Sequence, residues 1–160
     1  MTLSGVARLK AELKHLKTVE RGKNVRDIEE ARAHGDLSEN AEYHAAKDKQ
    51  GQLDGRMRFL EDAIARSEVI DIAKFSGDQV KFGATVTLSD EDNGNEVKYR
   101  IVGEMEADLK QGRISVTSPI ARALIGREVG DEVRVQAPGG PRGYEILSVE
   151  FIDDAVPAED

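Results

Sequence analysis

The chain has 160 residues, of which 39% are hydrophobic and 34% charged, and it contains no cysteine. This composition predicts one or two small globular domains and excludes disulfide bonds and thiolate metal sites. No hydrophobic run approaches the roughly 20 residues that cross a bilayer, and the N-terminus lacks a signal-peptide core, so we expect a cytoplasmic protein with no membrane partner.

The net charge of −8 is unevenly distributed along the chain. Residues 1–26 carry seven Lys or Arg and two acids, whereas residues 27–48 carry seven acids and two bases. From residue 76 onward there are nine bases and seventeen acids. Such segregation is typical either of proteins with charged partners or of solvated helix surfaces.

The segment from Leu3 to about Ala33 is predicted to be one long helix, in which only Gly22 disfavours helical structure, by about 1 kcal/mol. Four apolar residues follow the spacing of a coiled-coil seam: Val6, Leu9, Leu13 and Leu16. The same register then places three polar residues in the seam: Glu20, Lys23 and Asp27. Three apolar residues nearby are out of phase: Val19, Val25 and Ile28. We therefore expect the packing to loosen or shift towards the end of this helix.

A second helix is predicted from about Asn40 to Ser67. Its seam residues alternate at spacings of four and three: Ala46, Gln50, Leu53, Met57, Leu60 and Ile64. Two long helices with a short connection fold back on each other, so we expect an antiparallel coiled-coil hairpin with arms of about 45 Å. Because two helices cannot enclose a core, the hairpin is expected to project.

The hydrophobic period changes near Val69, and the rest of the chain predicts a small antiparallel β domain. Strands are expected over residues 80–90, 96–103, 114–118, 129–138 and 144–152. The turn DNGN at 92–95 and the loop GGPRG at 139–143 connect strands.

A short helix is predicted within the β domain, with Ser118 as its N-cap, Pro119 at its first position and Gly126 as its stop. The expected fold class is therefore α+β. The expected domains are a helical hairpin over residues 1–75, a β-rich domain over 76–156 and a frayed acidic tail over 157–160.

The segment HGDLSENAEYHAAK, residues 34–47, joins the two helices and concentrates carboxylates at the turn. Gly35 can adopt the left-handed conformation that ends a helix. Asp36 suits the N-cap of the second helix, and Glu39 then falls at the capping-box position. This structural interpretation leaves Glu42 unexplained.

A functional interpretation starts from the same spacing. Because residues three apart share a helix face, Asp36 and Glu39 would present two carboxylates side by side at an exposed tip. Mg²⁺ accepts one or two carboxylates and shares its other positions with water and phosphate. Two carboxylates are too few for tight binding, so we expect no metal on the chain alone and half of a site that another active centre completes. His34 and His44 do not predict a zinc site, because no thiolate assists them.

Five stretches follow one another along the chain: ARAHGDLSENAEYHAAK at 31–47, then IDIAKF, FGATVTL, YRIVGEMEADLKQGRISVTSPIARALIG and APGG. Together, and in this order, they resemble the bacterial GreA/GreB transcript cleavage factors over nearly the whole chain. The resemblance implies that the β-rich domain has an FKBP-like fold and docks on the rim of the secondary channel of RNA polymerase. The residues that match this docking loop are Ser118, Pro119, Ile120 and Ala121.

The resemblance also implies that the hairpin of a monomeric factor enters that channel. Asp36 and Glu39 match the family's essential acids, which help to hold a second Mg²⁺ so that the polymerase cleaves the 3′ end of its own nascent RNA in backtracked complexes. Arg32 and Lys47 match a basic patch that contacts this RNA, although intrahelical ion pairs would also explain them.

The remaining tip residues, Ser38, Glu42 and Tyr43, are expected to support the acidic turn. Tyr43 suits either the seam or stacking on a base, and Glu42 suits either the electric field of the tip or simple solvation. Two alternative functions stay open: an inhibitory paralogue that plugs the same channel, and a free-standing prolyl isomerase. The shortage of aromatic residues for an isomerase pocket argues against the second.

Overall fold

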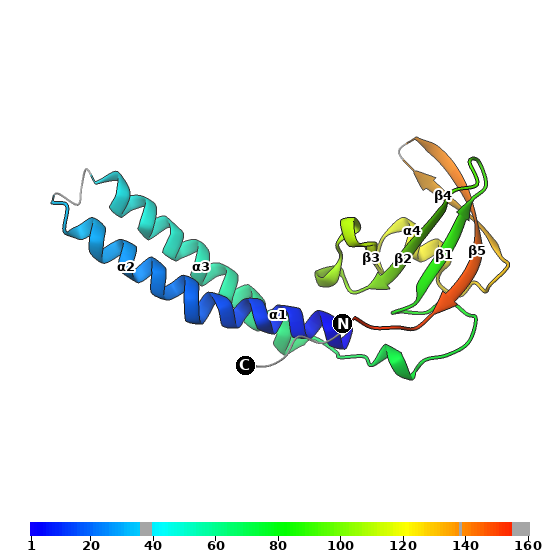
Figure 1. Ribbon diagram of the computed structural model, residues 1–160, viewed down its shortest axis with the longest axis horizontal. Coiled ribbons are helices and arrows are strands. Elements are labelled where there is room, and N and C mark those ends of the chain that lie inside the picture. The colour runs from blue at the N-terminus through cyan, green and yellow to red at the C-terminus, as the bar shows by residue number, and fades with distance from the viewer. Residues whose placement is uncertain (36–39, 138, 155–160) are drawn as a thin grey trace. The chain divides into compact units, whose positions relative to one another are not determined.

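Figure 1 shows the computed structural model of the chain, which describes residues 1–35, 40–137 and 139–154. The chain divides into two compact units. One unit is Val6–Ser67, which is helical, and the other combines Met1–Gly5 with the described residues from Glu68 onward. Helices and a sheet together make this an α+β protein, as predicted. Within the described residues, no helix is long and apolar enough to cross a membrane.

The first helical arm is continuous but contains a change of helix type. It consists of α1 (Leu3–His15), the π-helical turn η1 (Leu16–Glu20) and α2 (Arg21–Arg32). A π-helical turn accommodates one residue more than the α-helical path and so changes which residues face the neighbouring helix.

The extra residue explains how the first arm keeps one buried face. The regular register predicts Lys23 and Asp27 in the seam, but both are exposed, whereas Asn24 and Ile28, one residue further, are buried. The buried apolar residues of this arm are Val6, Leu9, Leu16, Ile28 and Ala31. The expected shift of the packing is confirmed, and the π-helical turn is its cause.

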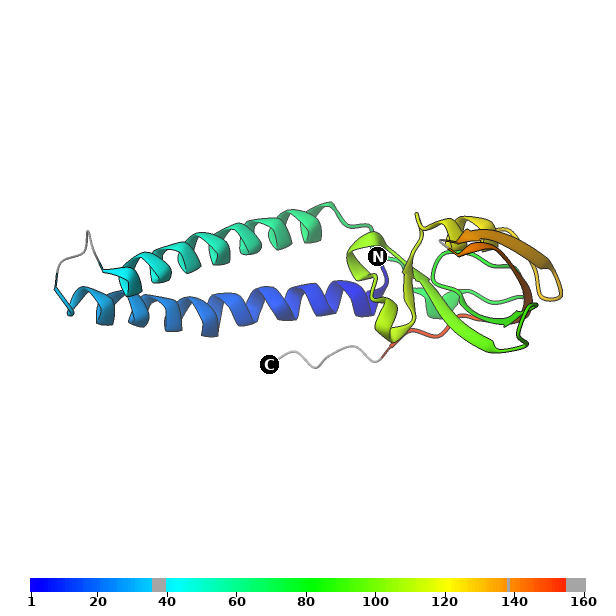
Figure 2. The same ribbon diagram turned by 90° about the horizontal axis from the view of Figure 1, so that it is seen from above.

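The second arm is the single helix α3 (Ala41–Arg66), which runs back beside the first arm (Figures 1 and 2). Two cross-arm contacts define the antiparallel direction: Asn24 pairs with Ala46, and Glu12 pairs with Arg56. Four of the predicted seam residues are buried, namely Ala46, Leu53, Met57 and Leu60. The other two, Gln50 and Ile64, are half-buried.

The described residues of the other unit form a five-stranded sheet with the order β3-β2-β1-β5-β4. The strands are β1 (Thr85–Asp90), β2 (Glu96–Val102), β3 (Arg113–Ser115), β4 (Glu132–Ala137) and β5 (Gly140–Glu150). Because β5 already begins at Gly140, the loop expected over residues 139–143 is shorter than predicted.

The sheet is mixed, so the prediction of a purely antiparallel sheet is wrong at one edge. Strand β3 pairs with β2 in parallel, while the other neighbours are antiparallel. Parallel pairing requires a connection that returns the chain to the same end of the sheet. Two 3-10 turns supply it here, η3 (Glu104–Glu106) and η4 (Leu109–Gln111).

The short helix α4 (Pro119–Leu124) begins as predicted. The Ser118 hydroxyl accepts the backbone N–H of Ala121 at 3.3 Å, Pro119 occupies the first turn, and Gly126 beyond the helix has a φ of +88°. Helix α4 contributes Ala121 and Leu124 to the core beneath the sheet. The other core residues are Val80, Ala84, Val86, Leu88, Ile101, Ile114, Val133, Val135, Tyr144 and Ile146.

Residues 1–5 are held in the β-rich unit by hydrogen bonds. The N–H of Ile70 donates to the carbonyl of Met1 at 2.8 Å. The carboxylate of Glu106, only 6% exposed, accepts the N–H of Thr2 at 3.0 Å, the N–H of Gly103 at 2.8 Å and the Thr2 hydroxyl. These three donors compensate the carboxylate for the water that it loses on burial.

Candidate functional site

The first arm ends beside the acidic turn. Helix α2 ends at Arg32, and Gly35 follows with a φ of +112°, a conformation that favours glycine. The prediction of a left-handed residue at Gly35 is therefore confirmed. The two predicted tip carboxylates, Asp36 and Glu39, and the supporting Ser38 lie outside the described residues.

The second arm begins where the hydrophobic period predicts, next to Asn40, but its cap is not the predicted residue. Asn40 is the N-cap of α3: its backbone is extended, with φ −84° and ψ 101°, and its side-chain oxygen accepts the N–H of Tyr43 at 3.0 Å. The expectation that Asp36 caps this helix, with Glu39 at its third position, is therefore wrong. Asparagine and aspartate are comparable caps, and the one next to the regular helix fills the position.

Asn40 also connects the two arms. Its side-chain N–H₂ donates to the carbonyl of Ala31 in the last turn of α2, at 2.6 Å. Asn24 makes the reciprocal contact, from the first arm to the carbonyl of Ala46 on the second, at 2.9 Å. Two asparagines on opposite arms therefore hold the arms together near the turn.

A hydrogen bond between two exposed side chains spans the turn on the protein surface. Nδ1 of His34 lies 2.9 Å from a carboxylate oxygen of Glu42, and the two side chains are 54% and 70% exposed. Glu42, predicted to support the tip, therefore contacts the residue that precedes Gly35. The described residues contain no group of three His, Asp or Glu that could hold a metal ion.

The predicted RNA-contacting residues lie on different arms. The guanidinium carbon of Arg32 lies 5.9 Å from the centre of the Tyr43 ring, a cation–π distance. Tyr43 also contacts the ring of His44 edge-on, with 5.8 Å between centroids. Lys47, one turn further along α3, donates to Gln50 at 2.9 Å and is exposed. Arg32 and Tyr43 therefore form a contact between the two arms, whereas the contact of Lys47 with Gln50 lies within α3.

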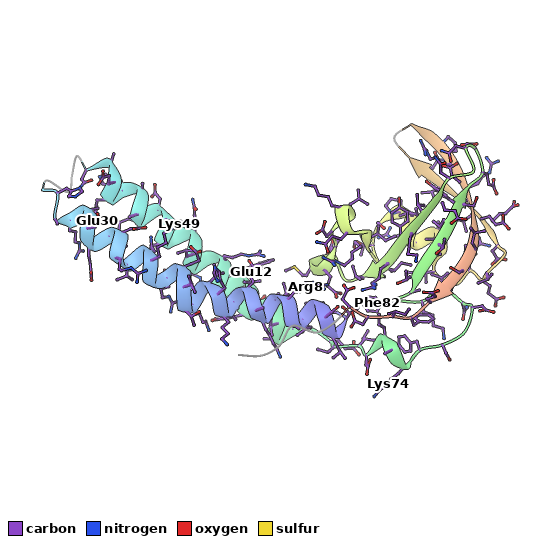
Figure 3. All side chains as sticks on the ribbon, in the orientation of Figure 1. Arg8, Glu12, Glu30, Lys49, Lys74 and Phe82 are labelled. Atoms are coloured by element: carbon purple, nitrogen blue, oxygen red, sulfur yellow. The ribbon has the colours of Figure 1, made fainter. Side chains whose placement is uncertain are left out.

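A groove of about 550 Å³ runs along the arms beside the turn. Its lining mixes acidic and basic side chains, among them Glu30 of α2 and Lys49 of α3, which Figure 3 labels. The other lining residues are Glu20, Lys23, Asn24, Asp27, Ala31, His34, Glu42, Ala45 and Ala46. Four carboxylates and two lysines line it, so the groove is acidic overall.

The predicted docking residues have different exposures. Pro119 is exposed and Ile120 is half-buried, so both can present apolar surface. Ser118 is engaged as the cap of α4, and Ala121 is fully buried in the core. A partner that contacts this segment would therefore touch Pro119 and Ile120, while Ser118 and Ala121 fix the helix that carries them.

Sequence reasoning missed Asn40 and His34. The sequence does carry a signal for Asn40, because an asparagine directly before a helical pattern is a typical N-cap, but Asp36 is a competing candidate of the same kind. The contact between His34 and Glu42 leaves no signal, because residues eight apart on either side of a turn have no fixed spacing.

Comparisons with known proteins cover nearly the whole chain. Residues 1–69 match the family described as "Transcription elongation factor, N-terminal", and residues 75–151 match "Transcription elongation factor, GreA/GreB, C-term". The matched segments define a two-part transcription elongation factor. The chain belongs to the GreA/GreB family.

Several named relatives are similar over almost their full length. Transcription elongation factor GreA of Anaeromyxobacter sp. (strain K) is 63% identical over 159 residues, which is 99% of this chain and 96% of the relative. The proteins of the same name from Mesorhizobium japonicum and Phenylobacterium zucineum are 62% and 60% identical over 152 residues, covering 95% of this chain and 97% of each relative. Among solved structures, GreA factor homolog 1 of Thermus thermophilus is 26% identical, covers 94% of this chain and 97% of its own, and superposes with a TM-score of only 0.43.

Proposed function

We propose that this protein binds RNA polymerase, inserts its helical arms through the secondary channel, and stimulates Mg²⁺-dependent cleavage of the nascent RNA 3′ end in backtracked complexes. Such cleavage would rescue arrested elongation. The observation that supports this most strongly is the membership of the GreA/GreB family, together with an acidic segment placed where two antiparallel arms meet. Helix α3 alone, with 26 residues, gives the arm a length of about 39 Å.

The two units would have different tasks. We regard the arms as a coiled coil interrupted by η1, and the β-rich unit as an FKBP-like domain that docks on the rim of the channel. Exposed Pro119 and half-buried Ile120 are the residues of the docking loop that can contact a partner. The protein would act as a monomer, because each channel admits one hairpin, and we place this action in the cytoplasm.

The acidic segment would complete a metal site of the polymerase. Asp36 and Glu39 supply carboxylate oxygens, which is the donor type that Mg²⁺ takes alongside phosphate and water. When bound, the second Mg²⁺ stabilises charge on the phosphodiester and lowers the pKa of a water molecule. The carboxylates of this chain would add ligands to that ion and orient water, and the bond-breaking groups would belong to the polymerase and its metals. The protein is therefore not an enzyme by itself.

Basic and aromatic residues beside the turn would hold the extruded RNA. Arg32, over the ring of Tyr43, and the exposed Lys47 present positive charge on the two arms. Contacts from such residues to phosphates add affinity without reading the sequence. Their role would be to keep the RNA 3′ segment in place while it is cleaved.

The test uses purified RNA polymerase halted in a defined backtracked complex with a labelled RNA 3′ end. We expect the protein to release short 3′ fragments with Mg²⁺, and to release none without the polymerase. Fragments formed without polymerase, or none formed with it, would overturn the proposal. Slower nucleotide addition without fragments would identify the inhibitory paralogue instead. The names of the relatives at about 60% identity favour the elongation factor over that alternative.

A further inference from the structure

We propose that Asn40 is a positioning residue that fixes the acidic segment relative to the first arm. This inference rests on the proposed function of Asp36 and Glu39. Asn40 directly follows Glu39 in the chain, and its side chain makes two hydrogen bonds at once. Its oxygen accepts the N–H of Tyr43 at 3.0 Å, and its nitrogen donates to the carbonyl of Ala31 at 2.6 Å.

An amide is the group that this position needs. The N–H of Tyr43 is one of the donors that the start of a helix leaves without a partner inside the helix. The carbonyl of Ala31, at the end of α2, accepts the N–H of His34 at 3.2 Å and has a second lone pair for the amide of Asn40. Serine or aspartate could cap α3, but neither would also reach Ala31 with a donor in the same geometry. Asn40 therefore defines both where α3 begins and how close that point lies to α2.

The residue on each side of the acidic segment has a defined conformation or contact. At one end, Gly35 follows α2 with its positive φ, and at the other end Asn40 is bonded to α2 through Ala31. The contact between His34 and Glu42 spans the same turn, but both side chains are exposed, and surface contacts of this kind contribute little. Beside the contact between Arg32 and Tyr43, the half-buried Asn40 therefore supplies a direct hydrogen bond between the arms at this point.

Catalysis should be sensitive to this connection. Mg²⁺ demands near-octahedral geometry with oxygens at about 2.0–2.1 Å, so a carboxylate offered to it must be placed accurately. A displacement of about 1 Å can cost about 100-fold in rate. Loosening the Asn40 contact should therefore lower the rate of cleavage in the bound complex and leave the affinity for polymerase nearly unchanged.

Asn24 provides a matched control within the same pair of arms. It makes the same type of bond, from a side-chain amide to a backbone carbonyl on the other arm, at 2.9 Å to Ala46. Its bond lies about 10 Å further from the turn, because seven residues separate Asn24 from Ala31. Asn40→Ser and Asn24→Ser each remove one cross-arm donor, and serine at position 40 keeps the helix cap.

The first measurement compares these variants with the unsubstituted protein in the backtracked complex. For Asn40→Ser we expect the cleavage rate at saturating protein to fall about tenfold or more, with the half-saturating concentration changed by less than about twofold. For Asn24→Ser we expect an unchanged saturating rate. Equal effects of the two variants, or an unchanged rate for Asn40→Ser, would overturn the inference. If the unsubstituted protein releases no fragments, the proposed function fails instead.

The second measurement needs no polymerase. Because the chain has no cysteine, single cysteines at the exposed Ala33 and Ala41 accept spin labels without competing sites. We expect electron–electron distances across the turn to be narrowly distributed in the parent and in Asn24→Ser, and broadened in Asn40→Ser. A distribution that stays narrow in Asn40→Ser would contradict the inference, even if the variant cleaves slowly. Thermal unfolding of each variant separates this result from loss of the fold.

Discussion

Gly5 and Glu106 lie so close together that a Cβ atom on residue 5 would come within 1.9 Å of a carboxylate oxygen of Glu106. The same carboxylate is buried and accepts the N–H groups of Thr2 and Gly103. The absence of a side chain at Gly5 is therefore what allows residues 1–5 to pack against the β-rich unit.

Gly5→Ala should destabilise the protein. The added methyl group must displace Glu106 from its donors, and overpacking of this kind costs about 1–3 kcal/mol. Gly51→Ala is the matched control, because a Cβ at Gly51 in α3 meets no atom within 4 Å. Alanine there should stabilise the helix by about 1 kcal/mol. Thermal and urea unfolding measure both changes, and equal shifts in the same direction would contradict the packing argument.

The pH dependence of stability should include a contribution from Glu61. Nζ of Lys17 lies 2.8 Å from its carboxylate, across the arms, and this hydrogen bond and charge lower the pKa of Glu61 below its ordinary value of 4.5. A carboxyl whose folded-state pKa is depressed stabilises the fold above its unfolded pKa, and that stabilisation is lost as the pH falls through the folded-state pKa. Glu61→Gln should therefore lower the unfolding temperature near neutral pH and have no effect in acid. In a Lys17→Met background, the substitution should have a much smaller effect near neutral pH, because only the charge of Arg21 then still lowers the pKa of Glu61.

Deleting Val19 should leave the arms paired. The residue lies in the π-helical turn η1 and is 50% exposed, and removing it would restore regular α-helix without rotating Asn24, Ile28 and Ala31 away from α3. Circular dichroism should show a cooperative transition within a few degrees of the parent's. Deleting Lys10, an exposed residue within regular α1, is the control and should be strongly destabilising, because it misaligns Val6 from Leu16. Similar losses in both deletions would refute the role assigned to the π turn.

Local chemistry made some elements predictable. The start of α4 follows from Ser118 and Pro119, whose preferences act within one helical turn, and the seam of α3 follows from a regular period. In the first arm, the spacing of apolar residues indicates that Ile28 does not follow the register of Val6 to Leu16. It does not predict the π-helical turn that causes this shift, because a single inserted residue has no compositional signature.

Two predictions from the sequence are wrong, the cap of α3 and the direction of β3, and both features depend on contacts that form only in the folded chain. Asp36 and Asn40 are both good caps four residues apart, and the contact with Ala31, which favours Asn40, exists only once the arms have paired. The parallel pairing of β3 likewise depends on the path of residues 103–112, which strand patterns do not encode. The family resemblance assigns the acidic residues Asp36 and Glu39 as a motif, and their role stays a prediction because it depends on a partner that this chain does not contain.

The most direct test of the central claim compares Asp36→Asn and Glu39→Gln with the parent in Mg²⁺ titrations of backtracked complexes. Glu30→Gln is the matched control, because it removes one carboxylate from the exposed surface of α2 a few residues before the turn. We predict that each tip variant lowers the saturating cleavage rate about 100-fold or more while binding polymerase as the parent does, and that Glu30→Gln cleaves normally. Cleavage at the parental rate by either tip variant would contradict the account.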